Sequence, residues 1–450
     1  MSYAGHAKAI ALLGLPLIGG NLAQFAIGMT DSVMLGWYGV EALAAVTLAN
    51  SYYFVIYLTG AGFGWAVMPM VAAANGEGDD VSARRSARMG LWLSWLFAAA
   101  AMPALWWAEP ILRAMGQQAE VSADAAHYLR ISGWGLFPAL LLVVLKSYLA
   151  AMERTQIVLW ITVLAALTNA AANYVFIFGH FGAPELGVRG AALASVITQI
   201  IALVAVVAYV LRALPEHELF RRFWRPDWEM FARVFRLGVP IGLTSLSEVT
   251  LFTASSLMMG WLGIVPLAAH GIALQLASAT FMVHMGLSNA ATVRVGNAYG
   301  RGDRAHMMRG ALVVTVMSLG LALLASAAFL IWPEALISLF LDPADPERAQ
   351  ILSIGVGLLA AAALFQLVDG GQVVALGLLH GVQDMTMPMV IAALSYWVVG
   401  LPCSYLLGFT FGFGGIGIWL GLVLGLACAA VLLMARFWRL GLGQGGSVQT

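Results

Sequence analysis

The sequence predicts an all-α integral membrane protein with twelve transmembrane helices in two six-helix, pseudo-symmetric lobes. Three observations predict this class: the composition, the recurrence of long apolar segments, and a repeat that relates the two halves of the chain. Of the 450 residues, 61% are hydrophobic and only 10% are charged, whereas soluble domains carry about 25% charged residues. Such a composition is typical of a chain that folds in lipid.

Apolar segments of roughly 20 residues or more recur along the whole chain, which is the length that an α-helix needs to cross a bilayer. Charged or Gly- and Pro-containing breaks separate these segments into twelve expected helices. Their ranges are 9–36, 42–72, 89–108, 128–151, 157–179, 190–212, 237–261, 266–294, 309–332, 350–379, 387–408 and 415–437. Because twelve is an even number, we expect both termini on the same side of the membrane.

The distribution of Lys and Arg predicts which side that is. Seventeen of these residues fall on the side of the termini and four on the other, with Lys146 left inside a span. Because positive charges are concentrated in cytoplasmic loops, we expect both termini in the cytoplasm.

The first half of the chain reappears in the second half. When the sequence is shifted by 224 residues, 14–86 overlays 238–310 without a gap and with 20 identities in 73 positions. Six spans in each half give both halves the same orientation in the membrane, an arrangement found in transporters whose site lies between the repeats. The predicted organisation is an N-terminal lobe at 1–212, a cytoplasmic amphipathic linker at 213–236 and a C-terminal lobe at 237–450. Arginines alternate with aromatic residues in this linker, which favours a position at the lipid headgroups; a solvated linker is the alternative.

Three carboxylates lie well inside expected spans: Asp31, Glu248 and Asp369. A charge at the centre of a bilayer costs at least ~2.5 kcal/mol on insertion scales, so such a residue usually faces a cavity or a partner and has a function. Each carboxylate belongs to a polar stripe at helical spacing. The stripes are Asn21, Gln24, Gly28 and Asp31; Thr244, Ser245, Glu248 and Ser255; and Gln366, Asp369 and Gln372.

These stripes favour cation binding. Oxygen ligands with a carboxylate suit hard cations such as Na⁺, and a buried carboxylate equally suits a proton. Asn169 and Asn173, one helical turn apart, would place amide oxygens beside Asp31. The alternatives are structural hydrogen bonds for the carboxylates and interhelical packing for the two asparagines. Lys146, His270 and His284 also lie within expected spans, and the sequence leaves their roles open.

Other functions lack the residues that they require. The chain has no HExxH, GxSxG, P-loop or CxxC pattern, so we expect neither an enzyme nor a cofactor. The glycines of "GAGFGW" lie inside a span with no preceding strand and indicate close helix packing. The formal net charge is zero, which gives no reason to expect nucleic acid as a partner.

At its polar motifs the chain resembles the multidrug and toxic compound extrusion (MATE) family, in particular its bacterial NorM-type branch. The motifs are "TDSVMLG" with Asp31, "SEVTLF" with Glu248, "VRVGNAYGRGD" at 293–303 and "FQLVDGGQVVALGLLHGVQD" with Asp369 and Asp384. The resemblance covers essentially the whole chain. One departure is that His380 and Gln383 stand where relatives often have Arg and Lys.

The resemblance implies an antiporter of the bacterial inner membrane that exports bulky, often cationic drugs in exchange for Na⁺ or H⁺. Glu248 and Asp369 would then bind the coupling cation, and Na⁺ is the metal ion that would bind there. Asp31, Asn169 and Asn173 would form a cation site in the N-terminal lobe. The cavity would expose Asp31, Gln24, Gln366 and Gln372 to small organic cations, and the expected unit is a monomer within the lipid bilayer. A lipid-linked precursor flippase of the wider superfamily is the alternative, whereas a channel would need a continuous polar lining.

Overall fold

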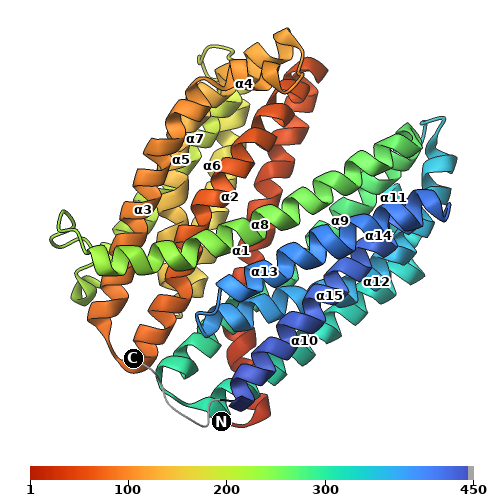
Figure 1. Ribbon diagram of the computed structural model, residues 1–450. Helices are drawn as coiled ribbons and strands as arrows, with labels where there is room; N and C mark the ends of the chain where they lie inside the picture. Colours follow the sequence, from red (N-terminus) through yellow and green to blue (C-terminus); the bar gives the residue numbers. More distant parts are fainter. Residues whose placement is uncertain (444–450) are drawn as a thin grey trace. The chain divides into compact units, whose positions relative to one another are not determined.

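The computed structural model describes residues 1–443, and within this part the chain forms helices and no strands (Figure 1). The helices are α1 (Tyr3–Tyr38), α2 (Val40–Glu77), α3 (Asp80–Trp106), α4 (Ala108–Ala114), α5 (Ala119–Ala151), α6 (Thr155–Phe178), α7 (Val188–Ala213), η1 (Pro215–His217), α8 (Trp228–Leu262), α9 (Ile264–Gly300), α10 (Arg304–Ile331), α11 (Pro333–Ser338), α12 (Arg348–Gly381), α13 (Thr386–Leu394), η2 (Ser395–Gly400), α14 (Leu401–Tyr405), η3 (Leu406–Thr410) and α15 (Gly414–Gly443). Twelve helical segments of this part are long and apolar enough to cross a membrane. The predicted all-α class and the twelve spans are confirmed.

The two repeats build their third and ninth spans in the same way. Asp79 accepts a hydrogen bond from the backbone N–H of Ser82 at 3.0 Å, and Asp303 accepts one from His306 at 3.0 Å. Each aspartate therefore caps the start of a helix, α3 or α10, whose first backbone N–H groups have no partner within the helix. The preceding glycines, Gly78 and Gly302, have φ of 74° and 68°, a conformation that favours glycine.

The chain separates into two compact units. Unit 1 comprises Met1–Ile18 and Leu243–Thr450, and unit 2 comprises Gly19–Gly242. Helix α1 therefore begins in unit 1 and ends in unit 2, whereas α8 begins in unit 2 and ends in unit 1. The boundaries of these units differ from those of the two halves expected from the repeat. The first turns of α1 belong to unit 1 with the C-terminal half, and the first turns of α8 belong to unit 2 with the N-terminal half. The functional lobes at 1–212 and 237–450, with the linker at 213–236, stay a prediction.

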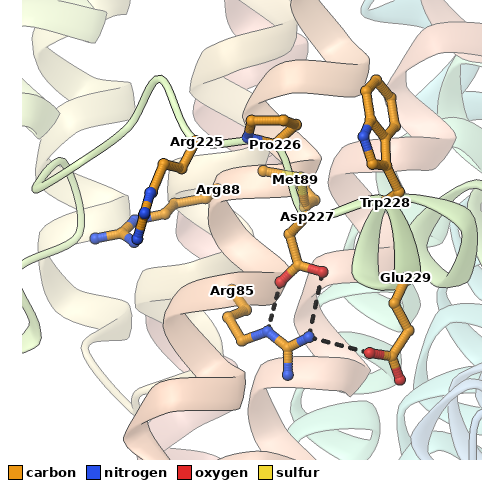
Figure 2. A pocket seen from close by; sticks show the side chains of 8 residues that line it. All are labelled: Arg85, Arg88, Met89, Arg225, Pro226, Asp227, Trp228 and Glu229. Carbon is orange, nitrogen blue, oxygen red and sulfur yellow. Dashed lines mark hydrogen bonds and ion pairs between the residues drawn. The ribbon is translucent and has the colours of Figure 1, made fainter.

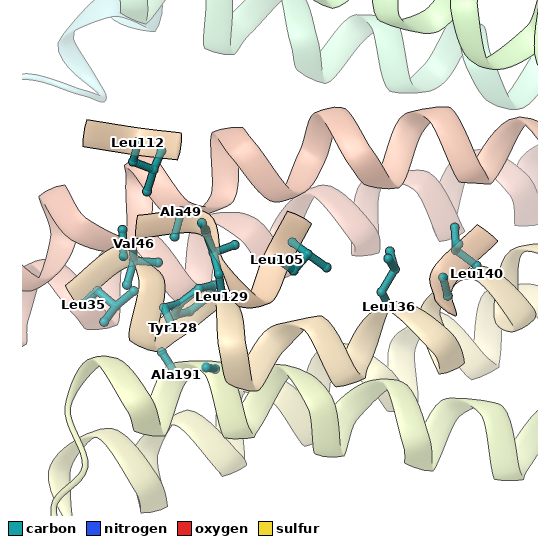
Figure 3. Close-up of a cluster of buried hydrophobic side chains, with 14 of the residues drawn as sticks. Leu35, Val46, Ala49, Leu105, Leu112, Tyr128, Leu129, Leu136, Leu140 and Ala191 are labelled. Atoms are coloured by element: carbon teal, nitrogen blue, oxygen red, sulfur yellow. The ribbon is translucent and has the colours of Figure 1, made fainter. Parts of the chain in front are cut away.

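Unit 2 is built around α5, which packs against α2, α3 and α7. Its buried apolar cluster is shown in Figure 3 and includes Leu35, Val46, Leu105, Leu112, Tyr128, Leu129, Leu136 and Leu140. Because lipid is as apolar as these side chains, the cluster stabilises the unit through van der Waals contact and close fit. Gly62 on α2 shows how close that fit is: a Cβ there would lie 2.4 Å from the carbonyl oxygen of Gly238 on α8.

Unit 1 is built around α12, which packs against α9, α10 and α15. A Cβ at Gly377 would lie 2.3 Å from the hydroxyl oxygen of Ser288 on α9. This approach lets the Thr292 hydroxyl donate to the carbonyl of Gly377 at 2.9 Å, and the Ser288 hydroxyl donate to that of Val373 at 2.7 Å. The tight α9–α12 contact fixes the part of α12 that carries Asp369.

The eleventh span is not the regular helix that its sequence predicts. It runs from α13 through η2, α14 and η3, and both η segments are π-helical. Wide turns of this kind are rare and occur frequently at functional sites. The first of them contains Tyr396, whose side chain is fully buried.

Candidate functional site

Glu248 on α8 and Asp369 on α12 form a carboxylate pair within unit 1. Asp369 is 0% exposed, and Glu248 is its electrostatic neighbour. Within the described residues, neither oxygen of Asp369 has a hydrogen-bond partner, and neither does Oε1 of Glu248. A buried carboxylate without partners is costly, the more so beside a second carboxylate, and a bound cation or proton removes that cost. The pair therefore has the chemistry of a reversible cation site.

Amide and hydroxyl groups surround this pair. Gln366 and Gln372, one turn to either side of Asp369 on α12, are both 0% exposed. The side chain of Gln366 and Oε1 of Gln372 have no partner among the described residues, while Nε2 of Gln372 donates to the Tyr396 hydroxyl oxygen at 2.5 Å. The unpaired oxygens of the two glutamines are hard ligands of the type that binds Na⁺.

Sequence reasoning missed Tyr396. Its ring is an electrostatic neighbour of both Glu248 and Asp369. A tyrosine in an apolar span is common at membrane interfaces, so the sequence gives no sign that this one is buried beside two carboxylates. The feature that marks Tyr396 is the π-helical turn. This turn depends on backbone packing rather than on local composition, so the sequence does not reveal it.

The two histidines of α9 are held by hydrogen bonds. His270 accepts a hydrogen bond at Nδ1 from the indole of Trp419 at 3.1 Å, and its Nε2 therefore donates to Ser256 at 3.0 Å. His284 Nδ1 lies 2.9 Å from the Ser318 hydroxyl, which donates to the carbonyl of Gly370 at 3.3 Å. Both rings thus have structural partners.

Two glycines, Gly370 and Gly371, follow Asp369 on α12, and close packing explains the first of them. A Cβ at this position would lie 2.8 Å from Cε1 of His284. Glycine therefore lets the His284 ring approach α12 next to Asp369, and α12 continues through it without interruption. Gly371 faces Ala430 at an ordinary contact distance of 3.8 Å.

A second polar group lies in unit 2, around Asp31 on α1. Nδ2 of Asn173 donates to Asp31 at 2.5 Å and is 3.2 Å from Oδ1 of Asn169, and Asn169 also bonds to Asp31. The structure therefore brings together the three residues Asp31, Asn169 and Asn173. Gln24 lies exposed on α1, and the described residues give it no hydrogen bond to this group.

A pocket of about 360 Å³ borders Ser32, the residue that follows Asp31 on α1. Ser32, Thr47, Asn50, Ser51, Tyr53 and Phe54 line it. Asn50 bonds to Tyr128, whose ring is an electrostatic neighbour of Asp31. Hydroxyls, an amide and aromatic faces next to a carboxylate suit an organic cation. Asn50 and Tyr128 were not expected from the sequence, although Thr47, Asn50 and Ser51 stand at helical spacing on α2.

Lys146 lies on α5, where its ammonium group donates to the Thr162 hydroxyl at 2.9 Å. That hydroxyl donates in turn to the carbonyl of Val158. Within the described residues no three His, Cys, Asp or Glu side chains form a metal-binding group.

A membrane protein with twelve candidate spans and carboxylates within three of them has the features of a transporter. A family model named MatE matches residues 16–175 and 240–406. The chain belongs to this family of transporters, and it is a multi-pass membrane transporter of small molecules rather than an enzyme. A transporter that makes and breaks no bonds has no need of a catalytic cofactor.

Relatives and solved structures agree with this assignment. The chain is 47% identical over 441 residues to a "Probable multidrug resistance protein NorM" of Rhizobium meliloti (strain 1021), covering 98% of this chain and 94% of the relative. It is 48% identical over 438 residues to the protein of the same name in Agrobacterium fabrum, covering 97% and 94%. Among solved structures, an outward-facing multidrug resistance MATE family transporter of the MOP superfamily has a TM-score of 0.88 at 20% identity, covering 98% of this chain and 97% of that one. This last likeness shows the fold.

Proposed function

We propose that the protein is a multidrug efflux antiporter of the bacterial inner membrane that exchanges organic, often cationic drugs for Na⁺ or H⁺. The names of its NorM relatives support multidrug efflux, and the family supports transport. The observation that carries the antiport proposal is the pair Glu248 and Asp369, buried without hydrogen-bond partners at three carboxylate oxygens.

In this proposal the coupling cation binds at Glu248 and Asp369, with Gln366 and Gln372 as neighbouring ligands. The cation is Na⁺ or H⁺, because the same carboxylate oxygens accept both. Empty, the pair is destabilised by repulsion and lost hydration. Antiport requires the cation and the drug to favour different conformations, because a ligand with equal affinity for two states shifts nothing.

The group around Asp31 has a different proposed role. Its carboxylate is already hydrogen bonded by two asparagines, and the adjacent pocket of about 360 Å³ offers aromatic faces. We assign a second cation site to Asp31, Asn169 and Asn173. Asp31 and Gln24 in unit 2, and Gln366 and Gln372 in unit 1, are the residues proposed to meet the drug.

The proposed orientation places both termini in the cytoplasm, on the side with seventeen of the Lys and Arg residues of the sequence. The proposed unit is a monomer, because one chain supplies every residue of both polar groups.

The test is transport by purified protein in lipid vesicles. A fluorescent organic cation is supplied, and a Na⁺ gradient or an H⁺ gradient is imposed in separate experiments. We expect gradient-driven movement of the dye with one ion or both, above that of protein-free vesicles. Dye that moves at the protein-free rate under both gradients contradicts the proposal. Movement of a lipid-linked precursor in place of the dye would favour a flippase.

A further inference from the structure

A pocket of about 420 Å³ lies where the linker enters α8, within unit 2, and its lining residues include neither Asp31 nor Glu248 nor Asp369 (Figure 2). Three arginines line it, Arg85, Arg88 and Arg225, together with the carboxylates Asp227 and Glu229 and the indole of Trp228. The drug and cation sites proposed above give this pocket no role.

The two carboxylates of the pocket are both used by one arginine. Nε of Arg85 donates to Asp227 at 2.5 Å, and Nη2 of Arg85 donates to Asp227 at 3.2 Å and to Glu229 at 3.3 Å. Figure 2 shows this network on the α8 side of the pocket. Both carboxylates face Arg85, and the lining as a whole keeps a net charge of +1, from three arginines against two carboxylates.

The other two arginines keep their positive charge. Arg88 donates to the backbone carbonyls of Leu219 and Glu218 at 2.6 Å each; these acceptors are uncharged and leave three of its five N–H groups available. Arg225 is exposed, and its side chain has no ion pair or hydrogen bond within the described residues. In Figure 2 both side chains extend to the same side, away from the Arg85–Asp227 pair. Two cationic groups that line one pocket favour an anion.

The location of the pocket indicates which anion. Arg85 and Arg88 lie in the first turns of α3, and Trp228 begins α8; both helices are membrane spans. The pocket is therefore at the level where spans leave the hydrocarbon, which is the headgroup region. Trp224 and Trp228 are 73% and 66% exposed, and tryptophans are enriched at this level because their amphipathic rings prefer it.

We propose that this pocket binds the phosphate of an anionic phospholipid headgroup. Arg225 and Arg88 are the phosphate ligands, since planar guanidinium groups bind phosphate oxygens in pairs of charge-assisted hydrogen bonds. Trp228 contacts the lipid at the boundary between headgroup and chains. Because Arg88 also holds the linker carbonyls, the bound lipid stabilises the linker between α7 and α8.

The test measures phosphatidylglycerol bound to the purified full chain, by titration in nanodiscs of phosphatidylcholine and by native mass spectrometry after detergent extraction. Arg225→Gln removes a ligand that supports no other contact. Arg222→Gln is the matched control, because Arg222 is also exposed on the linker and is not part of the pocket lining. General attraction to a charged surface changes the affinity for an anionic lipid about fivefold per arginine. Loss of charge-assisted hydrogen bonds lowers that affinity about tenfold or more.

We expect Arg225→Gln to weaken phosphatidylglycerol binding about tenfold or more, Arg225→Lys to weaken it less, and Arg222→Gln to weaken it no more than about fivefold. Equal losses in the Arg225→Gln and Arg222→Gln variants would overturn the site in favour of diffuse attraction. Inorganic phosphate is added as a second arm, and we expect it to leave the lipid bound. Its displacement of the lipid at millimolar concentration would overturn the assignment to a lipid and indicate a soluble phosphate instead.

Discussion

Nε2 of Gln372 donates a hydrogen bond to the hydroxyl oxygen of Tyr396 at 2.5 Å, which joins α12 to the π-helical turn of the eleventh span. Both side chains are fully buried. The bond leaves the amide oxygen of Gln372 without a partner among the described residues. In the proposed cation site, Tyr396 orients Gln372 so that its oxygen remains available to a cation beside Asp369.

Tyr396→Phe tests this relationship. The variant leaves a buried amide donor unpaired, which costs about 1–3 kcal/mol, and it frees the Gln372 side chain to rotate. We expect the cation concentration for half-maximal transport to rise about fivefold or more, because one ligand is no longer oriented. Tyr405→Phe is the control, since Tyr405 is 51% exposed in the same span. A loss of thermal stability with an unchanged cation dependence would mean that Tyr396 has only a structural role.

Asp369→Asn removes the charge at the proposed coupling site and keeps the side chain's size. We expect gradient-driven dye transport to fall to the protein-free rate while the yield and the thermal unfolding temperature are maintained, because the variant no longer buries an unpaired carboxylate. Asp342→Asn makes the same chemical change at an exposed position and should transport normally. Normal transport by Asp369→Asn under both gradients would refute the assignment of Asp369.

Gly377→Ala tests the contact between α9 and α12. The added Cβ would lie 2.3 Å from the Ser288 hydroxyl and 2.5 Å from the Ser288 carbonyl oxygen. Overpacking of this kind costs about 1–3 kcal/mol, so we expect a clear fall in the thermal unfolding temperature in detergent. Gly320→Ala on α10 meets no atom within 4 Å and should unfold at the same temperature or higher. Equal stability of the two variants would show that the helices can separate without cost.

The ion pair of Arg85 and Asp227 predicts a dependence of stability on pH. The Arg85 hydrogen bond lowers the pKa of Asp227 from its ordinary value of 3.8. Folding therefore gains stability from this group above pH 3.8 and loses it as the pH falls through the lower folded value. Both side chains are partly exposed, so the gain is under about 1 kcal/mol.

Asp227→Asn should accordingly unfold at a slightly lower temperature than the unmodified protein at neutral pH. The gap should close as the pH falls below 3.8, where the carboxylate of the unmodified protein becomes protonated. Thermal unfolding of both proteins, from neutral pH to below pH 3.8, measures this difference in unfolding temperature. A gap that persists unchanged in acid would mean that the carboxylate charge does not contribute.

The sequence predicts the spans well and their ends less well. Hydropathy is a sum over many residues, so all twelve spans appear in it. It fails at the start of α3, expected at 89 and found at Asp80, because the charged first turns of that helix lie outside the apolar run. There the relevant signal is the cap at Asp79.

The site was predictable where it depends on spacing along one helix. Helical periodicity alone groups Gln366, Asp369 and Gln372, and all three are buried together. Tyr396 and Asn50 were missed because their proximity to a carboxylate depends on how separate helices pack. Gln24 shares the stripe of Asp31, yet it is exposed, since a stripe fixes a face of the helix and not what covers that face.

In the proposed antiport, a cation and a drug move in opposite directions on one protein. The most direct measurement imposes a gradient of an organic cation across vesicles that contain the protein, with no initial Na⁺ or H⁺ gradient, and follows tracer Na⁺ and internal pH. We expect Na⁺ or H⁺ to move against the direction of the drug, and Asp369→Asn to abolish this movement. Drug that crosses without any opposing flux of Na⁺ or H⁺ would contradict it.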